Sequence, residues 1–228
     1  MFLKIGHRGA KAYEIENTLQ SFQKAMELGA NAIELDVRRT MDEKLAVIHD
    51  DNLKRVFGAD VQVRRATLKE LKLLTGDRLP SLAEALKFLD NKTEKILVEL
   101  KETGYEGEVL DALKKEKVHD RVIVISFHEK ALSEVRRLDD IIETGLIYSR
   151  HKTPVAAALR LNAQYLVPLY KVAYAKTIRE AHQNHLKVVV WTINTKAEAE
   201  QYRDREVDGI ASDTPDIFQA LAERVAVS

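Results

Sequence analysis

Cysteine is absent from this chain of 228 residues, which excludes disulfides, thiolate-bound zinc, iron–sulfur clusters and cysteine nucleophiles. Glycine and proline are scarce, at 9 and 4 residues, and no low-complexity tract or Pro/Ser-rich linker divides the chain. No apolar run approaches the ~18 residues that a transmembrane helix needs, so we expect no membrane span. The first residues lack a basic segment followed by a long apolar stretch, and we therefore expect a cytoplasmic protein without a secretory signal.

The chain also lacks an excess of charge of either sign. Its 36 Lys and Arg residues balance 36 Asp and Glu residues, giving a formal net charge of +0. A nucleic-acid-binding protein usually has a basic excess, so we expect no nucleic-acid partner. Hydrophobic residues make up 45% of the chain and charged residues 32%, which supplies a sizeable core and excludes wholesale disorder.

Short β-type runs alternate with amphipathic helical stretches along the whole sequence. The expected strands are residues 2–6, 32–37, 95–100, 121–126, 143–147, 165–168, 187–191 and 209–211. This α/β alternation predicts a parallel sheet with helical crossovers, and eight units favour closure into a (β/α)8 TIM barrel. An open doubly wound sheet is the alternative, but it usually has a G-x-G-x-x-G first turn, whereas residues 6–9 read Gly-His-Arg-Gly. We expect residues 1–228 to form one domain.

The interval between the second and third barrel strands is much longer than the others. Within it, residues 45–48 and 61–63 resemble short strands, and residues 67–74 resemble a short helix. We interpret residues 50–79 as an elaborated loop on the rim of the barrel and not as an independent domain.

Acidic side chains end two of the expected strands. Glu34 and Asp36 lie two residues apart, so both should point into the barrel, and Glu99 and Lys101 repeat this spacing at the end of the third strand. Three converging carboxylates repel one another unless a cation compensates. The spacing leaves two interpretations open: a site for Mg²⁺, Ca²⁺ or Mn²⁺, or a metal-free salt-bridge cluster with Lys101 and Arg8.

Two histidines lie beside expected strand ends near these acids. His7 follows the first strand, and His49 follows the short strand after Asp36. Such a pair could supply a proton donor and acceptor near neutral pH, or each could be a polar rim residue or a metal ligand. No serine lies in a G-x-S-x-G motif, so we do not expect serine hydrolase chemistry.

An ordered set of motifs runs along almost the whole chain. Its members are His7-Arg8-Gly9, Glu16-Asn17-Thr18, Glu34-Leu35-Asp36, His49-Asp50, and residues 79–84, 98–101, 126–127, 190–194 and 212–216. In this order they resemble the signature of the glycerophosphodiester phosphodiesterase family. The resemblance implies a metal-dependent TIM barrel that hydrolyses small glycerophosphodiesters, such as glycerophosphocholine or glycerophosphoethanolamine, to glycerol phosphate and an alcohol, a reaction of lipid and glycerol metabolism.

The resemblance also implies a role for each matching residue. By position, the divalent ion would be bound by Glu34, Asp36 and Glu99, the acid–base pair would be His7 and His49, the phosphate would meet Arg8 and Lys101, and the substrate pocket would include Glu16, Phe127 and Trp191. For Trp191, plain packing is an alternative role. The attacking group could be water, or it could be the glycerol hydroxyl of the substrate, which would form a cyclic phosphate first.

Two features depart from the family pattern. Ile15 stands where the family usually has proline before Glu-Asn-Thr, and the elaboration at 50–79 is shorter than in many members. In the family that the chain resembles, this segment shapes substrate choice, so a lysophospholipase D-type activity on lysophospholipids stays open. A non-catalytic phosphate-binding barrel is a second alternative. The oligomeric state, including a homo-oligomer, is also left open.

Overall fold

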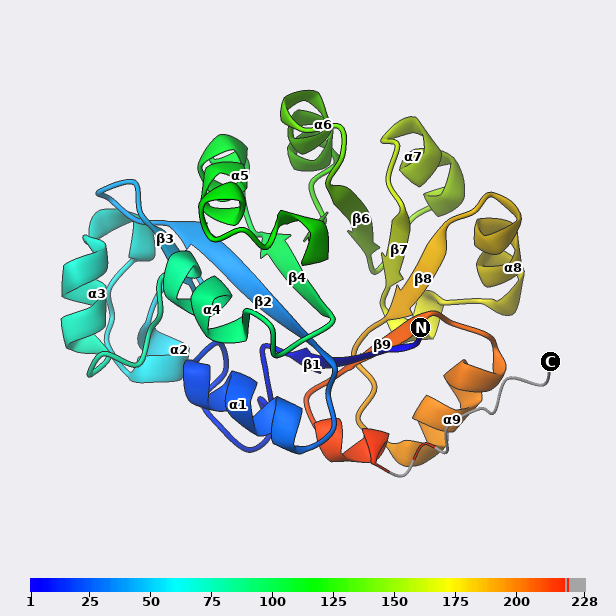
Figure 1. Ribbon diagram of the computed structural model, residues 1–228, viewed down its shortest axis with the longest axis horizontal. Coiled ribbons are helices and arrows are strands. Elements are labelled where there is room, and N and C mark those ends of the chain that lie inside the picture. The colour runs from blue at the N-terminus through cyan, green and yellow to red at the C-terminus, as the bar shows by residue number, and fades with distance from the viewer. Residues whose placement is uncertain (220, 222–228) are drawn as a thin grey trace.

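One sheet of nine strands forms the centre of the computed structural model, which describes residues 1–219 and 221 (Figure 1). The strand order is β1-β9-β8-β7-β6-β5-β4-β2-β3, and β1 also pairs with β2, which closes the barrel. All pairings are parallel except that between β2 and β3. The strands are β1 (Leu3–His7), β2 (Ala32–Arg39), β3 (Leu45–Val47), β4 (Lys95–Leu100), β5 (Val122–Ser126), β6 (Glu143–Tyr148), β7 (Tyr165–Pro168), β8 (Lys187–Val190) and β9 (Gly209–Ser212). The predicted eight-stranded TIM barrel is confirmed.

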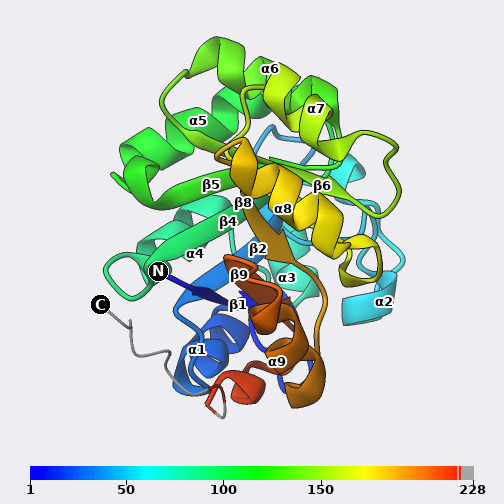
Figure 2. The same ribbon diagram turned by 90° about the vertical axis from the view of Figure 1, so that its right-hand side faces the viewer.

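Helices cover the outside of the barrel in both ribbon views (Figures 1 and 2). They are α1 (Leu19–Glu27), α2 (Lys54–Phe57), α3 (Leu68–Leu74), α4 (Leu82–Leu89), α5 (Glu106–Lys115), α6 (Glu129–Leu138), α7 (Pro154–Arg160), α8 (Ala175–Gln183) and α9 (Lys196–Asp204), with 3-10 turns at Val63–Arg65, His119–Arg121, Tyr170–Val172 and Pro215–Phe218. None of the helices in this part of the chain has the length and apolar character needed to cross a membrane.

The alternation of side chains along β2 separates the core from the site. Ile33, Leu35 and Val37 face outward and are fully buried against the surrounding helices. Glu34 and Asp36 consequently face the barrel interior, as the two-residue periodicity predicts. The outward-facing apolar residues stabilise the fold, and the inward-facing residues are left to form a polar site.

The segment after β3 differs in detail from the expectation. Residues 61–63 do not form a strand; they make a single bridge between Asn52 and Gln62 and then turn into the 3-10 helix. The expected helix at 67–74 is present as α3, because Thr67 and Glu70 form a capping box at its start. This segment packs on β3 around a small apolar cluster and lies at one edge of the molecule (left in Figure 1).

The sequence Asp213-Thr214-Pro215, a cap followed by proline in the first turn, predicts a helix over residues 215–225, which the structure describes only in part. Pro215–Phe218 forms a 3-10 helix that begins with proline, as the Thr214-Pro215 sequence indicates. Residues 220 and 222–225 lie outside the described residues.

Gly9 fixes the turn that follows β1. Its φ is 82°, and a Cβ atom there would lie 2.4 Å from Ser21 Oγ in α1. A side chain is therefore disfavoured both by the left-handed backbone and by the contact with α1. The third residue of His7-Arg8-Gly9 thus permits the close approach of this turn to α1.

We expect Gly9→Ala to lower the free energy of unfolding by about 2–5 kcal/mol, from backbone strain and overpacking together. Gly76→Ala is the matched control, because Gly76 has a φ of 60° but open space around its Cα. Strain alone predicts a loss of about 1–2 kcal/mol there. Urea unfolding measures both, and equal losses would show that the contact with Ser21 is unimportant.

Candidate active site

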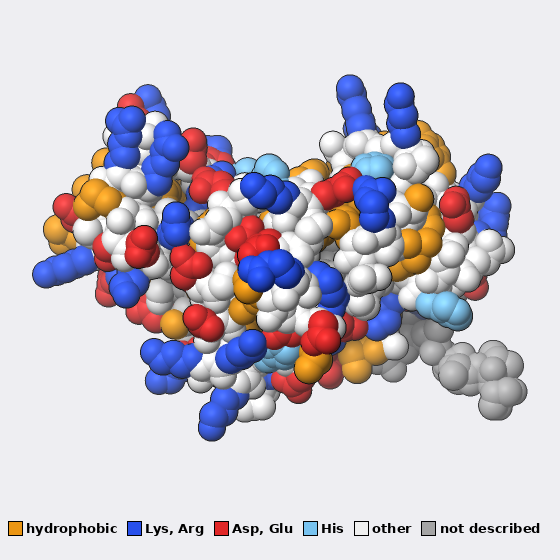
Figure 3. Space-filling model, turned by 90° about the horizontal axis from the view of Figure 1, so that it is seen from above, with side chains coloured by type: hydrophobic (Ala, Val, Ile, Leu, Met, Phe, Trp, Pro, Cys, Tyr) orange, Lys and Arg blue, Asp and Glu red, His pale blue; other side chains and the backbone are white. Residues whose placement is uncertain are grey.

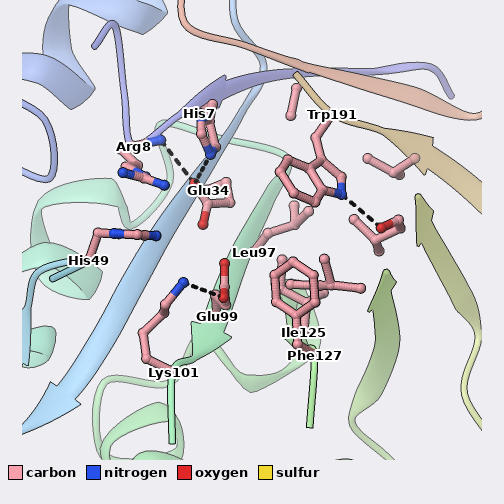
Figure 4. A pocket seen from close by; sticks show the side chains of 14 residues that line it. His7, Arg8, Glu34, His49, Leu97, Glu99, Lys101, Ile125, Phe127 and Trp191 are labelled. Atoms are coloured by element: carbon pink, nitrogen blue, oxygen red, sulfur yellow. Dashed lines mark hydrogen bonds and ion pairs between the residues drawn. The ribbon is translucent and has the colours of Figure 1, made fainter. Parts of the chain in front are cut away.

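The carboxyl ends of the barrel strands surround a cavity of about 160 Å³ (Figure 4). Polar groups form one side of it, and apolar side chains from β4 to β9 form the other. The 14 lining residues are His7, Arg8, Glu34, His49, Leu97, Glu99, Lys101, Ile125, Phe127, Ile147, Val167, Val189, Trp191 and Ala211. Eight of the ten residues predicted for the site are among these.

His7 is the last residue of β1 and is buried. Its Nδ1 lies 2.7 Å from Oδ1 of Asp213, which follows β9. A carboxylate only accepts hydrogen bonds, so Nδ1 donates and Nε2 remains for other partners. Burial lowers the pKa of His7, although the hydrogen bond with Asp213 partly opposes the change. The ring is therefore oriented by Asp213 and favoured in its neutral form.

Arg8 adopts a left-handed backbone conformation, with a φ of 55°. This turn lets its backbone N–H donate to Glu34 Oε2 at 2.9 Å. Its side chain is buried, with Nη1 donating to Glu16 Oε1 at 2.9 Å and Nε lying 3.1 Å from Asp36 Oδ2. The guanidinium group thus contacts two carboxylates, which fix its position, while the backbone of Arg8 contacts a third.

The Glu16-Asn17-Thr18 motif supports the same region from the loop before α1. Glu16 lies beside Arg8 and does not line the cavity. Asn17 donates from Nδ2 to Asp36 Oδ2 at 2.8 Å, and its Oδ1 accepts from the Asp36 backbone N–H. Thr18 caps α1. Each residue of the motif therefore makes a different contact.

Glu34, Asp36 and Glu99 offer oxygen atoms that lie within 4.8 Å of one another. Burial and repulsion from Asp36 raise the pKa of Glu34 well above its ordinary value. The same two causes raise the pKa of Glu99 to about 7. Burial would also raise the pKa of Asp36, but Arg8 and Lys101 lower it to about 2. Two of the three carboxyl groups therefore lack sufficient positive charge nearby.

Lys101 is the second cation of the cluster. Its Nζ lies 2.6 Å from Glu99 Oε1 and 3.3 Å from Asp36 Oδ1. Glu34 Oε1, however, is buried without a hydrogen-bond partner among the described residues. Salt bridges with Lys101 and Arg8, one of the two interpretations of the sequence, thus neutralise part of the charge of the acidic cluster. The remaining carboxylate oxygens form a donor set that fits a hard divalent cation.

His49 reaches the cavity from the loop after β3. Its Nδ1 lies 2.6 Å from Asp50 Oδ1, and its backbone carbonyl accepts from Arg38 Nε. Burial lowers the pKa of His49, with Asp36 opposing the change. Like His7, His49 is held by a carboxylate at Nδ1, so its Nε2 is the nitrogen that a ligand can reach.

Two aromatic residues stand at the apolar side. Phe127 and Trp191 meet edge to face with ring centroids 5.7 Å apart, and Trp191 Nε1 donates to the Val167 carbonyl (Figure 4). Phe127 remains 42% exposed, so it is available to a ligand at the mouth of the cavity.

The chain matches the model of the "Glycerophosphoryl diester phosphodiesterase family" over residues 7–217. A glycerophosphodiester phosphodiesterase of Caldanaerobacter subterraneus is 33% identical to it, covering 97% of this chain and 98% of that protein. The chain belongs to this family. Its enzyme class, phosphoric diester hydrolase, is the one predicted from the sequence.

Solved structures of family members have the same fold. The glycerophosphodiester phosphodiesterase of Thermotoga maritima is 32% identical with a TM-score of 0.86, covering 97% of this chain and 99% of that one. A phosphodiesterase of Oleispira antarctica, solved with its product sn-glycerol-3-phosphate, is 25% identical with a TM-score of 0.88, covering 95% and 94%.

Sequence reasoning missed several residues that this member of the phosphodiesterase family places around the site. Asn17, Asp50 and Asp213 lie inside the motifs that carry the resemblance, so their positions were a usable signal. Arg55 gave no such sequence signal, because it lies in the elaborated segment, outside these motifs. In the structure it contacts Asp50 and Glu16.

We expect Glu34→Gln to weaken binding of Mg²⁺, Ca²⁺ or Mn²⁺, measured by calorimetry. Loss of a charged ligand should cost at least the roughly 10–100-fold typical of an outer-sphere partner. The control is Glu106→Gln, a buried carboxylate outside the cluster that accepts from the Gly104 N–H. Equal affinities in wild type and Glu34→Gln would contradict the metal site.

Proposed function

We propose that this enzyme hydrolyses glycerophosphodiesters to glycerol phosphate and an alcohol, with a divalent ion at Glu34, Asp36 and Glu99. The observation that carries the proposal is the convergence on one cavity of two carboxylate-held histidines and this acidic cluster. A phosphodiester needs its charge neutralised, a nucleophile deprotonated and a leaving alkoxide protonated. The site has groups of the right type for each need.

Arg8 and Lys101 are proposed to bind the phosphate. Both side chains line the cavity, and Arg8 has donors in a fixed plane that suits phosphate oxygens. The divalent ion, when bound, would supply further charge neutralisation and polarise a phosphoryl oxygen. The fixed contacts of Arg8 orient the substrate before reaction.

His7 and His49 are proposed to divide the proton transfers. The Nε2 atom of one histidine takes the proton of the attacking hydroxyl while the hydroxyl oxygen forms a bond to phosphorus. The other gives a proton to the alcohol oxygen as the phosphorus–oxygen bond breaks. We assign the donor role to His49, because it lies at the rim and its side chain is 32% exposed, compared with 10% for His7.

The attacking hydroxyl belongs either to water or to the glycerol of the substrate. In the second case a cyclic phosphate forms first, and water then opens it with the histidines in exchanged roles. Both routes use the same two nitrogens and the same phosphate contacts, so the proposal covers both.

The dimensions of the cavity favour a small water-soluble substrate. At about 160 Å³ it is smaller than the ~300–1,000 Å³ that encloses a drug-sized ligand. The apolar side, including the exposed Phe127, is the one feature that favours lysophospholipids instead. An acyl chain would have to lie outside the cavity, so we place this activity second.

Turnover assays on glycerophosphocholine, glycerophosphoethanolamine and lysophosphatidylcholine test the proposal. We expect hydrolysis of at least one glycerophosphodiester, its loss in excess chelator, and its recovery when Mg²⁺, Mn²⁺ or Ca²⁺ is added. Exclusive turnover of lysophosphatidylcholine would favour the second candidate. Full activity in chelator would refute the metal dependence.

Changing the leaving group separates the two histidines. His7→Ala and His49→Ala should each lower kcat/KM on a natural diester by about a hundredfold or more. The nitrophenolate group of a nitrophenyl phosphodiester can leave as an anion without being protonated, so the variant that lacks the general acid should be partly spared on this substrate. We expect that variant to be His49→Ala.

Circular dichroism provides the control for folding of both variants. If both lose activity equally on both substrates, the division of proton transfers is wrong. A large fall for wild type on a nitrophenyl diester without a glycerol hydroxyl would favour the cyclic route.

A further inference from the structure

Arg55 joins two carboxylates at the edge of the site. It lies in α2, within the elaborated segment. Its Nε donates to Asp50 Oδ2 at 2.6 Å, while Nη1 and Nη2 donate to Glu16 Oε2 and Oε1 at 2.8 and 2.6 Å. All three nitrogens of the planar guanidinium are thus engaged, which fixes the two carboxylates relative to each other.

Each of these carboxylates also contacts a side chain that lines the cavity. Asp50 uses its other oxygen, Oδ1, for His49 Nδ1, and Glu16 Oε1 accepts from Arg8 Nη1 as well. A continuous set of hydrogen bonds therefore runs from Arg8 through Glu16, Arg55 and Asp50 to His49. Arg55 is its midpoint and does not line the cavity itself.

We propose that Arg55 is a positioning residue that holds the ring of His49 through Asp50, so that Nδ1 is bound to Asp50 and Nε2 is left for the substrate; this rests on the proposed function of His49. The hydrogen bonds from Arg55 and His49 overcome the effect of burial and lower the pKa of Asp50 to about 2. Asp50 is therefore ionised and can only accept, so Nδ1 of His49 carries a proton in both the neutral and the charged ring. Nε2 is then the nitrogen that gains or loses the transferred proton.

His49 depends on this set of bonds more than Arg8 does. Arg8 keeps its contact with Asp36 and its backbone bond to Glu34 when Glu16 moves. His49 is held at its ring by Asp50, and Asp50 is held by Arg55. Removal of Arg55 should therefore impair proton transfer more than phosphate binding.

The Arg55 side chain is 49% exposed, so water screens the charge of its ion pairs. A misplaced catalytic group costs up to about a hundredfold in rate. We expect Arg55→Met to lower kcat by roughly ten- to a hundredfold with less than a threefold change in KM.

Two further variants distinguish the effect of the planar guanidinium, which donates to two carboxylates at once, from the effect of its positive charge. Arg55→Lys keeps the charge but cannot hold both carboxylates, so it should recover little of the lost kcat. Lys54→Met is the matched control, because Lys54 is the neighbour in α2 and its side chain pairs with Asp60 at the surface. Its kcat should remain within twofold of wild type. Wild-type kcat in Arg55→Met would overturn the proposal.

A double-mutant cycle tests whether Arg55 acts through His49. In a His49→Ala background, Arg55→Met should have no further effect on kcat, because the residue that it positions is gone. A full additional loss in that background would overturn the proposal and assign Arg55 a general structural role.

A measurement that needs no turnover completes the test. Nitrogen-15 NMR at pH 8 should show His49 with its proton on Nδ1 in wild type and a mixture of tautomers in Arg55→Met. An unchanged tautomer would overturn the proposal. If wild type itself fails to turn over any diester while the tautomer changes as expected, the proposed function fails and the positioning by Arg55 stands.

Discussion

Repulsion among three buried carboxylates is the constraint on which the site depends. Arg8 and Lys101 are held where they compensate part of that charge, and the remaining deficit raises the pKa values of Glu34 and Glu99. In the left-handed turn after β1, the backbone of Arg8 contacts Glu34 and its side chain contacts Asp36. On the face of the molecule shown in Figure 3, by contrast, side chains of both charges are interspersed.

The fold and the centre of the site were accessible from the sequence, because both depend on short-range periodicity. Alternation along β2 places Glu34 and Asp36 inside the barrel. A residue at the carboxyl end of a barrel strand lies at the mouth of the barrel. The elaborated segment was less accessible: residues 61–63 have a strand-like composition, but Gln62 finds only a single bridging partner. Glu16 was expected in the pocket, and its position behind Arg8 depends on a contact with Arg55 that spacing does not reveal.

The two sides of the cavity correspond to different parts of the barrel. The polar side comes from the ends of β1, β2 and β4 and from the loop after β3, where Glu34, Glu99 and His49 lie. The apolar side continues through β5 to β9 with residues such as Ile125 and Val189. Because strands that are neighbours in the sheet are also neighbours around the cavity, the charged lining residues Arg8, Glu34, Glu99 and Lys101 gather on one side of it. A ligand with one ionic and one less polar end is therefore oriented as it enters.

The hydrogen bond between His7 and Asp213 joins residues separated by 206 positions. The first barrel strand also pairs with the last, β9, along four residue pairs. During synthesis from the N-terminus, the partner of His7 therefore emerges from the ribosome long after His7 itself. A nascent chain in which most helices have already formed still lacks the oriented imidazole. Completion of the barrel and orientation of His7 by Asp213 therefore coincide, so truncated translation products that lack β9 and Asp213 should have no oriented His7.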